Sequence, residues 1–392
     1  MPLLLHLADV HLGAPHLDMG TAAVEQRERQ RAALGRAVDE GLKAGVDAAL
    51  ICGDLFDSDA QSRSSVERTV GELARLTHAG VRVVIIPGCH DRDGDHSIYR
   101  AFDLARMAGL PAGSDLLTLL TPERPELLLK DLDLIIYGRV AAAQRANGGP
   151  LDGLGARTDE RAAWKVGMLH ASRRESGPAQ GESGSFGDAE IAATGLDYLA
   201  LGHQHAFSSG RAGETTWAYP GAPELVAVDE DGAGSSCLVR LADGAGADSS
   251  VHVERIRVGR TVFRAEPIDA ASLADQSGLV ERLAELADPD LVLQVTVGGI
   301  AADTLQLDEA EIERILAPSF LQVRVRDRST VVPFAGLDLP ADSVVGKFVA
   351  DMDSRQRAAE ARGDTQAADQ AARILRLGRR LLSAESDGVR LA

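Results

Sequence analysis

The chain has 392 residues and a formal net charge of -18. This length exceeds that of one ordinary domain and predicts two or three domains. A composition of 45% hydrophobic and 26% charged residues is typical of a soluble globular protein and excludes a disordered or fibrous chain. The acidic balance argues against binding of nucleic acid by the whole surface, because phosphate contacts need local Lys and Arg. Any contact with nucleic acid would therefore be local or mediated by metal.

The sequence shows no basic leader with a cleavage site, and no apolar run that is long enough to cross a bilayer. Three widely spaced cysteines, Cys52, Cys89 and Cys237, offer no disulfide framework. Their spacing agrees with a reducing compartment. We therefore expect a cytoplasmic protein that does not enter a membrane.

Apolar runs alternate with helical patterns in the first part of the chain. We predict strands at 3–8, 46–52, 81–86, 132–137, 166–169 and 198–201, and helices at 21–44 and 64–78. The order strand, helix, strand, helix, strand at the start predicts an α/β fold with a mainly parallel core.

A domain boundary is predicted near residue 259. Beyond it, strands at 262–265, 291–297 and 321–325 alternate with helices at 279–286 and 308–316. This pattern predicts a first domain at 1–258 and a small α/β domain at 259–335. Apolar residues at helical spacing then predict a helical tail at 336–392.

Five short groups of Asp, His, Gly and Cys stand where the apolar runs end. They are Asp9 and His11; Gly53, Asp54 and Asp57; Gly88, Cys89, His90 and Asp91; His170; and Gly202, His203 and His205. Strand ends in an open α/β sheet meet at one edge, so these residues can converge on a single site. Imidazole and carboxylate groups gathered in this way indicate a metal centre.

The groups favour two metal ions rather than one. Two divalent ions about 3.5–4 Å apart can hold both the attacking and the leaving oxygen in a displacement at phosphorus. Such a pair needs a bridging carboxylate, for which Asp54 is the natural candidate. On an extended segment Asp9 and His11 would point to the same side, as would His203 and His205. One such pair alone is weak evidence, because isolated histidines on strands are more often structural.

These groups resemble the motifs of the calcineurin-like metallophosphoesterase superfamily, which are D-x-H, G-D-x-x-D, G-N-H-[DE], H and G-H-x-H. The match covers roughly residues 1–258, and the stretches 196–205 and 219–224 are similar to the DNA-repair exonuclease branch that includes SbcD and YhaO. The resemblance implies a β-sandwich flanked by helices, a small α/β capping domain and a C-terminal helical tail.

The resemblance also implies a role for each site residue. One ion would be held by Asp9, His11, Asp54 and His205, and the other by Asp54, Cys89, His170 and His203. His90 would face the scissile phosphate and stabilise charge or protonate the leaving oxygen. Asp91 would orient the imidazole of His90, and Asp57 would hold the metal-binding loop.

Position 89 departs from the family pattern, which has asparagine there, whereas this chain has Cys89. A thiolate is anionic and softer than an amide oxygen. If Cys89 coordinates, it would favour zinc or iron over the manganese that the resemblance implies. The alternative is a buried, inert thiol, which would leave the second ion short of a ligand.

The sequence thus predicts a metal-dependent phosphodiesterase, an exonuclease or endonuclease of DNA repair that uses a hydroxide held between two ions and His90 as phosphate-facing acid. The resemblance implies DNA and an SbcC-like or YhaN-like ABC ATPase as partners and leaves a homodimer open. The helices of the tail would either dock on the ATPase or pack against each other. Two alternatives stay open. One is hydrolysis of nucleotides or other small phosphodiesters, and the other is a non-catalytic, metal-binding scaffold. The presence of His90 argues against the scaffold, because a site without chemistry has no need for a phosphate-facing acid.

Overall fold

The computed structural model describes residues 1–139, 149–152, 154, 160–174, 185–228, 231–242, 250–302, 305–331 and 343–384. The chain divides into two compact units, Met1–Phe263 and Arg264–Ala392. The boundary predicted near residue 259 lies just before this division. The boundary predicted between 335 and 336 falls outside the described residues. Among the helices described, none is long and apolar enough to span a membrane.

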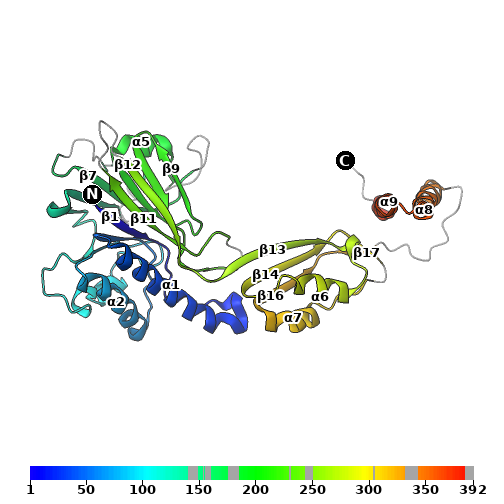
Figure 1. Ribbon diagram of the computed structural model, residues 1–392, viewed down its shortest axis with the longest axis horizontal. Coiled ribbons are helices and arrows are strands. Elements are labelled where there is room, and N and C mark those ends of the chain that lie inside the picture. Colours follow the sequence, from blue (N-terminus) through cyan, green and yellow to red (C-terminus); the bar gives the residue numbers. More distant parts are fainter. Residues whose placement is uncertain are drawn as a thin grey trace. The chain divides into compact units, whose positions relative to one another are not determined.

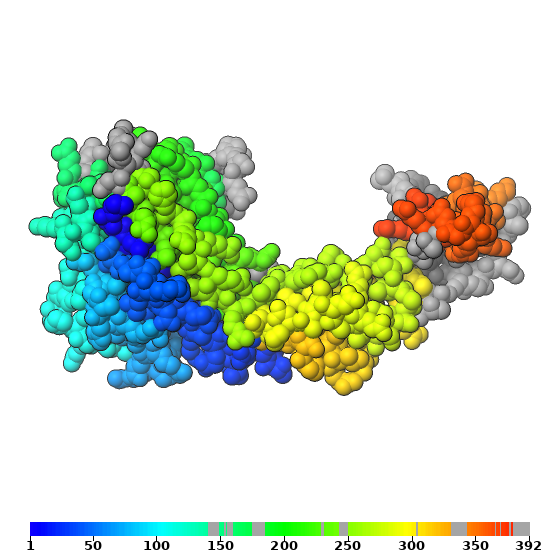
Figure 2. Space-filling view, in the orientation of Figure 1, coloured from blue at the N-terminus to red at the C-terminus, as the bar shows by residue number. Residues whose placement is uncertain are grey.

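The first unit contains two six-stranded sheets (Figure 1). The first sheet has the order β12 (Ser250–Arg257), β11 (Ser235–Ala242), β1 (Leu3–Leu7), β2 (Ala48–Cys52), β3 (Arg82–Ile86) and β4 (Leu117–Leu119). Strands β1 to β4 are parallel, as predicted for the core, and β11 pairs antiparallel with both β1 and β12. In the space-filling view the blue N-terminal residues lie against the green chain of these late strands (Figure 2).

The second sheet has the order β5 (Glu126–Leu129), β6 (Leu134–Arg139), β7 (Trp164–His170), β8 (Tyr198–Gly202), β10 (Thr215–Tyr219) and β9 (Ser208–Ala212). Strands β6, β7, β8 and β10 are parallel, and the edge strands β5 and β9 are antiparallel to their neighbours. Both sheets therefore have a parallel centre. The strands that deliver the predicted site residues all belong to these two centres.

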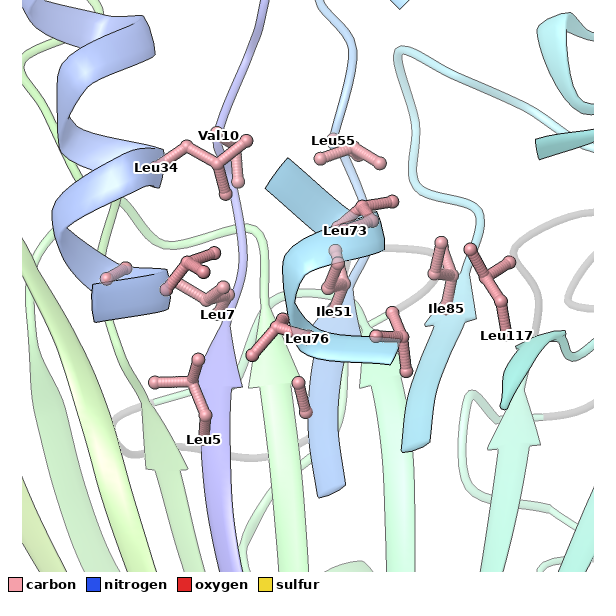
Figure 3. Packing of buried hydrophobic residues seen from close by; sticks show 14 of the residues in the cluster. Leu5, Leu7, Val10, Leu34, Ile51, Leu55, Leu73, Leu76, Ile85 and Leu117 are labelled. Atoms are coloured by element: carbon pink, nitrogen blue, oxygen red, sulfur yellow. The ribbon is translucent and has the colours of Figure 1, made fainter. Parts of the chain in front are cut away.

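Side chains from both sheets form the interior of a β-sandwich. Leu4 and Leu50 of the first sheet share one buried cluster with Val166 and Tyr198 of the second. The opposite face of the first sheet is covered by the helices α1 (Ala23–Ala44) and α2 (Arg63–His78), whose side chains pack on it (Figure 3). The central strands are thus buried on both faces, which explains their continuous apolar sequences. The predicted fold class is confirmed.

Several elements differ from the prediction. Helix α1 begins at Ala23 rather than at residue 21, because a 3-10 turn at Leu17–Ala22 precedes it with Gly20 at a φ of 54°. Apolar patterns do not predict the strands β4, β5, β9, β10, β11 and β12, nor the short helices α3 (Ile98–Ala101), α4 (Leu104–Met107) and α5 (Asp188–Thr194). Most of these strands lie at or next to sheet edges, where partly polar sequences give a weaker signal.

The second unit contains a three-stranded sheet of β13 (Val262–Asp269), β14 (Asp288–Gly298) and β16 (Phe320–Asp327). Helices α6 (Gln276–Ala284) and α7 (Glu309–Leu316) share a buried core with this sheet, and β15 (Ile300–Ala301) pairs with β17 (Thr330–Val331). The helices α8 (Val344–Ala361) and α9 (Thr365–Ala384) follow and contact one another. This unit has the α/β and helical content that the sequence predicts.

A histidine lies in the interior of the sandwich. His6 on β1 is fully buried, and its Nδ1 shares a hydrogen bond of 2.8 Å with the hydroxyl of Tyr198. Burial lowers the pKa of His6 to about 3, because the charged imidazolium would lose its hydration there. His6 is therefore neutral in the folded protein at physiological pH.

This burial makes stability depend on pH. His6 has an ordinary value of 6.5 and a pKa of about 3 in the fold, so between these values only the unfolded chain binds the proton. The free energy of unfolding should then fall as the pH is lowered, by up to about 1.4 kcal/mol per pH unit. The variant His6→Gln should lose this part of the slope. Urea titrations of both metal-free proteins at about pH 7 and pH 5 measure the difference, and identical losses in the two would contradict it.

Candidate metal centre

The five predicted groups meet at the carboxyl ends of β1, β2, β3, β7 and β8. Ligand atoms of Asp9, His11 and His205 lie within 4.8 Å of one another, and so do those of Cys89, His170 and His203. We call these the first and the second ligand set. The structure therefore brings together the residues that the resemblance assigns to each ion.

Asp54 lies between the two sets. Its Oδ2 is 3.8 Å from Nε2 of His11 in the first set. The same oxygen is 3.1 Å from Nε2 of His170 and 3.2 Å from Sγ of Cys89 in the second set. Burial opposes ionisation of Asp54, but the imidazole of His170 beside the carboxylate and the backbone N–H of His90, which donates to Oδ1, outweigh it and lower the pKa of the carboxyl. An anionic carboxylate in this position can bridge two cations.

Two histidines direct a nitrogen atom toward Asp54 because their other nitrogen has a partner. Nδ1 of His170 donates to the backbone carbonyl of Cys52 at 2.9 Å. Nδ1 of His11 lies 3.2 Å from Oδ1 of Asp57. In both imidazoles Nε2 is buried without a hydrogen-bond partner among the described residues. Buried polar atoms are rarely left unpaired, so a pair of metal ions fits the donor set that these residues form.

The second set holds a proton when no metal is bound. Burial opposes protonation of His170, but its interactions with Asp54, Cys89 and Asp9 raise its pKa well above the usual range. Burial disfavours the charged thiolate of Cys89 and therefore raises the pKa of its thiol. Metal ligands must be deprotonated, so binding of a cation to this set releases protons.

Asp9 is fully buried, and its two carboxylate oxygens accept hydrogen bonds from the backbone N–H of His203 at 2.9 and 3.0 Å. Burial raises its pKa, and the nearby histidines oppose this shift. The contact ties the ends of β1 and β8 together, which belong to different sheets. Asp9 therefore joins the two halves of the sandwich at the metal centre.

The backbone of the site residues is strained. Asp9, His11, Asp54 and His203 have φ values of 54°, 49°, 50° and 107°. Residues other than glycine rarely adopt such left-handed conformations, and each costs on the order of 1 kcal/mol or more. Hydrogen bonds between the loops hold them in place, including the N–H of His11 to the carbonyl of Asp54 at 2.9 Å. Strain of this kind is concentrated at functional sites.

These conformations correct the reasoning from residue spacing. Asp9 and His11 do reach one ligand set, but through left-handed turns rather than along an extended segment. His203 joins the second set and His205 the first, as the resemblance implies. The φ of 107° at His203 turns the chain between them.

Two glycines allow the loops to approach closely. A Cβ atom on Gly88 would overlap the side chain and backbone of Asp54, and one on Gly202 would overlap the carbonyl of Cys52. That carbonyl is the acceptor for Nδ1 of His170. Glycine is therefore required at both positions, because a side chain there would overlap the loops that carry the ligands.

His90 stands at the open side of the centre, with its side chain 47% exposed. Its Nδ1 donates to the backbone carbonyl of Asp57 at 2.9 Å and lies 3.9 Å from Oδ1 of the same residue. This leaves Nε2 as the ring nitrogen that a substrate can meet. The hydrogen bond of Asp57 to His11 lowers the pKa of the Asp57 carboxyl, so a negative charge stays beside both imidazoles.

Asp91 does not orient the imidazole of His90, contrary to the prediction. Its carboxylate is fully buried and points inward. It accepts hydrogen bonds from the backbone N–H groups of Gly88 at 2.8 Å, Asp54 at 3.2 Å and Phe56 at 3.1 Å, and from the hydroxyl of Tyr99 at 2.6 Å. Burial raises the pKa of Asp91 to about 6. The sequence cannot show this, because unpaired backbone donors of distant loops determine where the side chain turns.

The model of the calcineurin-like phosphoesterase family matches residues 2–207 of this chain, which include both ligand sets. The chain belongs to this family. It is a metal-dependent phosphoesterase with a site for two metal ions.

Relatives extend the likeness beyond the family match. The DNA double-strand break repair protein Mre11 of Aeropyrum pernix is 28% identical over 265 residues, which are 65% of this chain and 62% of that protein. This chain thus spans less than two thirds of the length of that relative. The uncharacterized metallophosphoesterase YhaO of Bacillus subtilis is 23% identical over 367 residues, which are 85% of both chains.

Proposed function

We propose that this phosphoesterase is a nuclease of DNA repair, which hydrolyses phosphodiester bonds of DNA in the cytoplasm. The observation that carries the proposal is the pair of ligand sets around Asp54 with His90 open beside them. Similarity to Mre11, which is named as a DNA double-strand break repair protein, supports DNA as the substrate.

The ligand sets and Asp54 would hold the metal ions. Asp54 would bridge the two cations, and the first and second ligand sets would complete their coordination. When bound, the cations would activate water as a nucleophile and draw negative charge away from the phosphate. They would also offset the buried carboxylates, which on a chain of net charge -18 would otherwise repel a nucleic acid.

His90 would act on the substrate directly. Because Nδ1 donates to the carbonyl of Asp57, Nε2 carries a proton only in the imidazolium form. The carboxylate of Asp57 lies 3.9 Å from Nδ1. A protonated Nε2 can donate to a phosphate oxygen or to the leaving oxygen, which is a role for a general acid.

Replacement of His90 tests this role. We expect His90→Ala to lower kcat for DNA hydrolysis by about 100-fold to 10,000-fold, because general acid catalysis is lost. Folding should be unchanged, since the side chain of His90 is 47% exposed. Metal content is measured for each variant, because His90 also lies within ligand distance of His11 and Asp57 and of Asp54 and Cys89. His96→Ala, an exposed histidine of the same loop, is the matched control.

The assay should compare linear DNA with a small aromatic phosphodiester, each with manganese, zinc and iron. Cleavage of the small diester without any cleavage of DNA would contradict the nuclease proposal. The protein would then be a phosphodiesterase for small substrates. Full activity of His90→Ala would instead remove His90 from the mechanism.

We further propose that Cys89 coordinates the second ion. Its Sγ lies 3.2 Å from Oδ2 of Asp54 and 3.9 Å from Nδ1 of His203. A set of one thiolate, two imidazoles and one carboxylate is chemically suited to zinc or iron, whereas the first set, without sulfur, also suits manganese. The two positions would then differ in metal preference.

Cobalt substitution tests Cys89 without any assay of activity. Co²⁺ bound by a thiolate shows a charge-transfer absorption in the near ultraviolet. We expect this band in the wild-type protein and in Cys237→Ala, whose buried thiol lies on β11 outside both ligand sets. Cys89→Asn should lack the band while still binding cobalt. A wild-type protein that binds two Co²⁺ ions without the band would show that the thiol is inert.

An ABC ATPase of the SbcC or YhaN type is the proposed protein partner, with α8 and α9 as the docking segment. Val344 and Ile374 on these helices are 75% and 43% exposed, so apolar surface is available there. A chain ending before Ser343 should lose binding to the ATPase but keep its metal ions. Unchanged binding would exclude this segment, and a shift to the monomer mass would indicate that it serves a homodimer instead.

A further inference from the structure

The carboxylate of Asp91 connects the loop that carries the bridging ligand Asp54 with the loop that carries Cys89 of the second ligand set. Its Oδ1 accepts from Gly88 N at 2.8 Å and from Asp54 N at 3.2 Å, and its Oδ2 accepts from Phe56 N at 3.1 Å. Asp54 and Phe56 follow β2, whereas Gly88 follows β3. The spacing between the two loops therefore depends on how this one side chain is held.

The fourth partner of Asp91 is the hydroxyl of Tyr99, which donates to Oδ2 at 2.6 Å. A carboxylate offers about four acceptor positions, so the three backbone donors and this hydroxyl satisfy it completely. The hydroxyl is the one partner that comes from a side chain. It is also the one that comes from neither ligand loop, because Tyr99 lies on α3 (Ile98–Ala101).

Helix α3 is itself fixed to the site. The backbone N–H of Ile98 donates to Oδ1 of Asp59 at 2.9 Å, and Asp59 follows the loop of Asp54 and Asp57. The side chain of Ser97 caps the helix by accepting from the N–H of Tyr99 at 3.2 Å. The ring of Tyr99 meets that of Phe56 edge to face, with centroids 6.3 Å apart. These contacts fix the position of Tyr99, so its hydroxyl is held within hydrogen-bond distance of Asp91.

We propose that Tyr99 is a positioning residue of the metal centre, which acts through Asp91 to fix the loop of Asp54 against the loop of Cys89 and His90. Without the hydroxyl, Oδ2 of Asp91 would keep one partner, and the carboxylate could turn away from the backbone groups that it aligns. The two loops are closely packed, since even a Cβ atom on Gly88 would overlap Asp54. A rotation of the Asp91 carboxylate would therefore move them relative to one another. The bridging oxygen would then shift relative to the second ligand set.

The inference rests on the proposed two-metal function of the site, but its test does not use DNA. Tyr99→Phe removes only the hydroxyl oxygen. Tyr198→Phe is the matched control, because it removes a hydroxyl that bonds His6 at 2.8 Å, in the sandwich interior and outside both ligand sets. Both variants lose one hydrogen bond of similar length.

Calorimetric titration of the metal-free proteins with Mn²⁺ and with Zn²⁺ measures the effect. We expect Tyr99→Phe to bind at least one of the two ions about 10-fold to 100-fold more weakly, which is the usual effect of losing a group that orients metal ligands. Tyr198→Phe should bind both ions as the wild type does. If the two variants lose similar thermal stability and both keep wild-type affinity, Tyr99 is only structural and the proposal is wrong.

A double variant shows whether Tyr99 acts through Asp91. Asp91→Asn should also weaken metal binding, and adding Tyr99→Phe to it should weaken binding no further, because interacting residues are not additive. Losses that multiply would overturn the proposal. Normal metal affinity of Tyr99→Phe would overturn the positioning proposal, whereas a wild-type protein that binds two ions but does not cleave DNA would overturn only the nuclease proposal.

Discussion

The metal centre depends on the position of one carboxylate, that of Asp54. Its Oδ2 lies within 3.1 to 3.8 Å of donors from both ligand sets, which come from strands of both sheets. Three further features of the fold hold Asp54 and the ligand sets in these positions. Parallel strands buried on both faces end at a common edge, left-handed residues turn the ligands inward, and glycines let the loops touch. The cost of the strain is offset by hydrogen bonds between loops that would otherwise be independent.

The buried acids of the centre have different tasks, which their surroundings determine. Asp54 has a lowered pKa because His170 faces it, and it is suited to bind cations. Asp91 has a raised pKa of about 6 and faces backbone donors, so it organises loops. Asp57 supports the imidazoles of His11 and His90. In the proposed centre the four carboxylates, counting Asp9, would therefore supply a bridge, two supports and a terminal ligand.

The sequence was sufficient to predict the class of fold and to name the ligand groups, because each group follows a long apolar run and needs particular chemistry. It was insufficient wherever a contact depends on the path of a loop. The spacing of Asp9 and His11 suggested an extended segment, yet both residues have left-handed backbone conformations. Tyr99 gave no signal at all, since its role follows from where α3 places one hydroxyl. The edge strand β12 and its neighbour β11 have partly polar sequences, which give a weaker signal than the apolar central strands.

The most direct test of this account is anomalous X-ray diffraction from crystals grown with a manganese or zinc salt. The account predicts two peaks on either side of Asp54, one in contact with Asp9, His11 and His205 and the other with His170, His203 and Cys89. A single peak in which Asp54 has no part, or two ions bound away from these side chains, would contradict it.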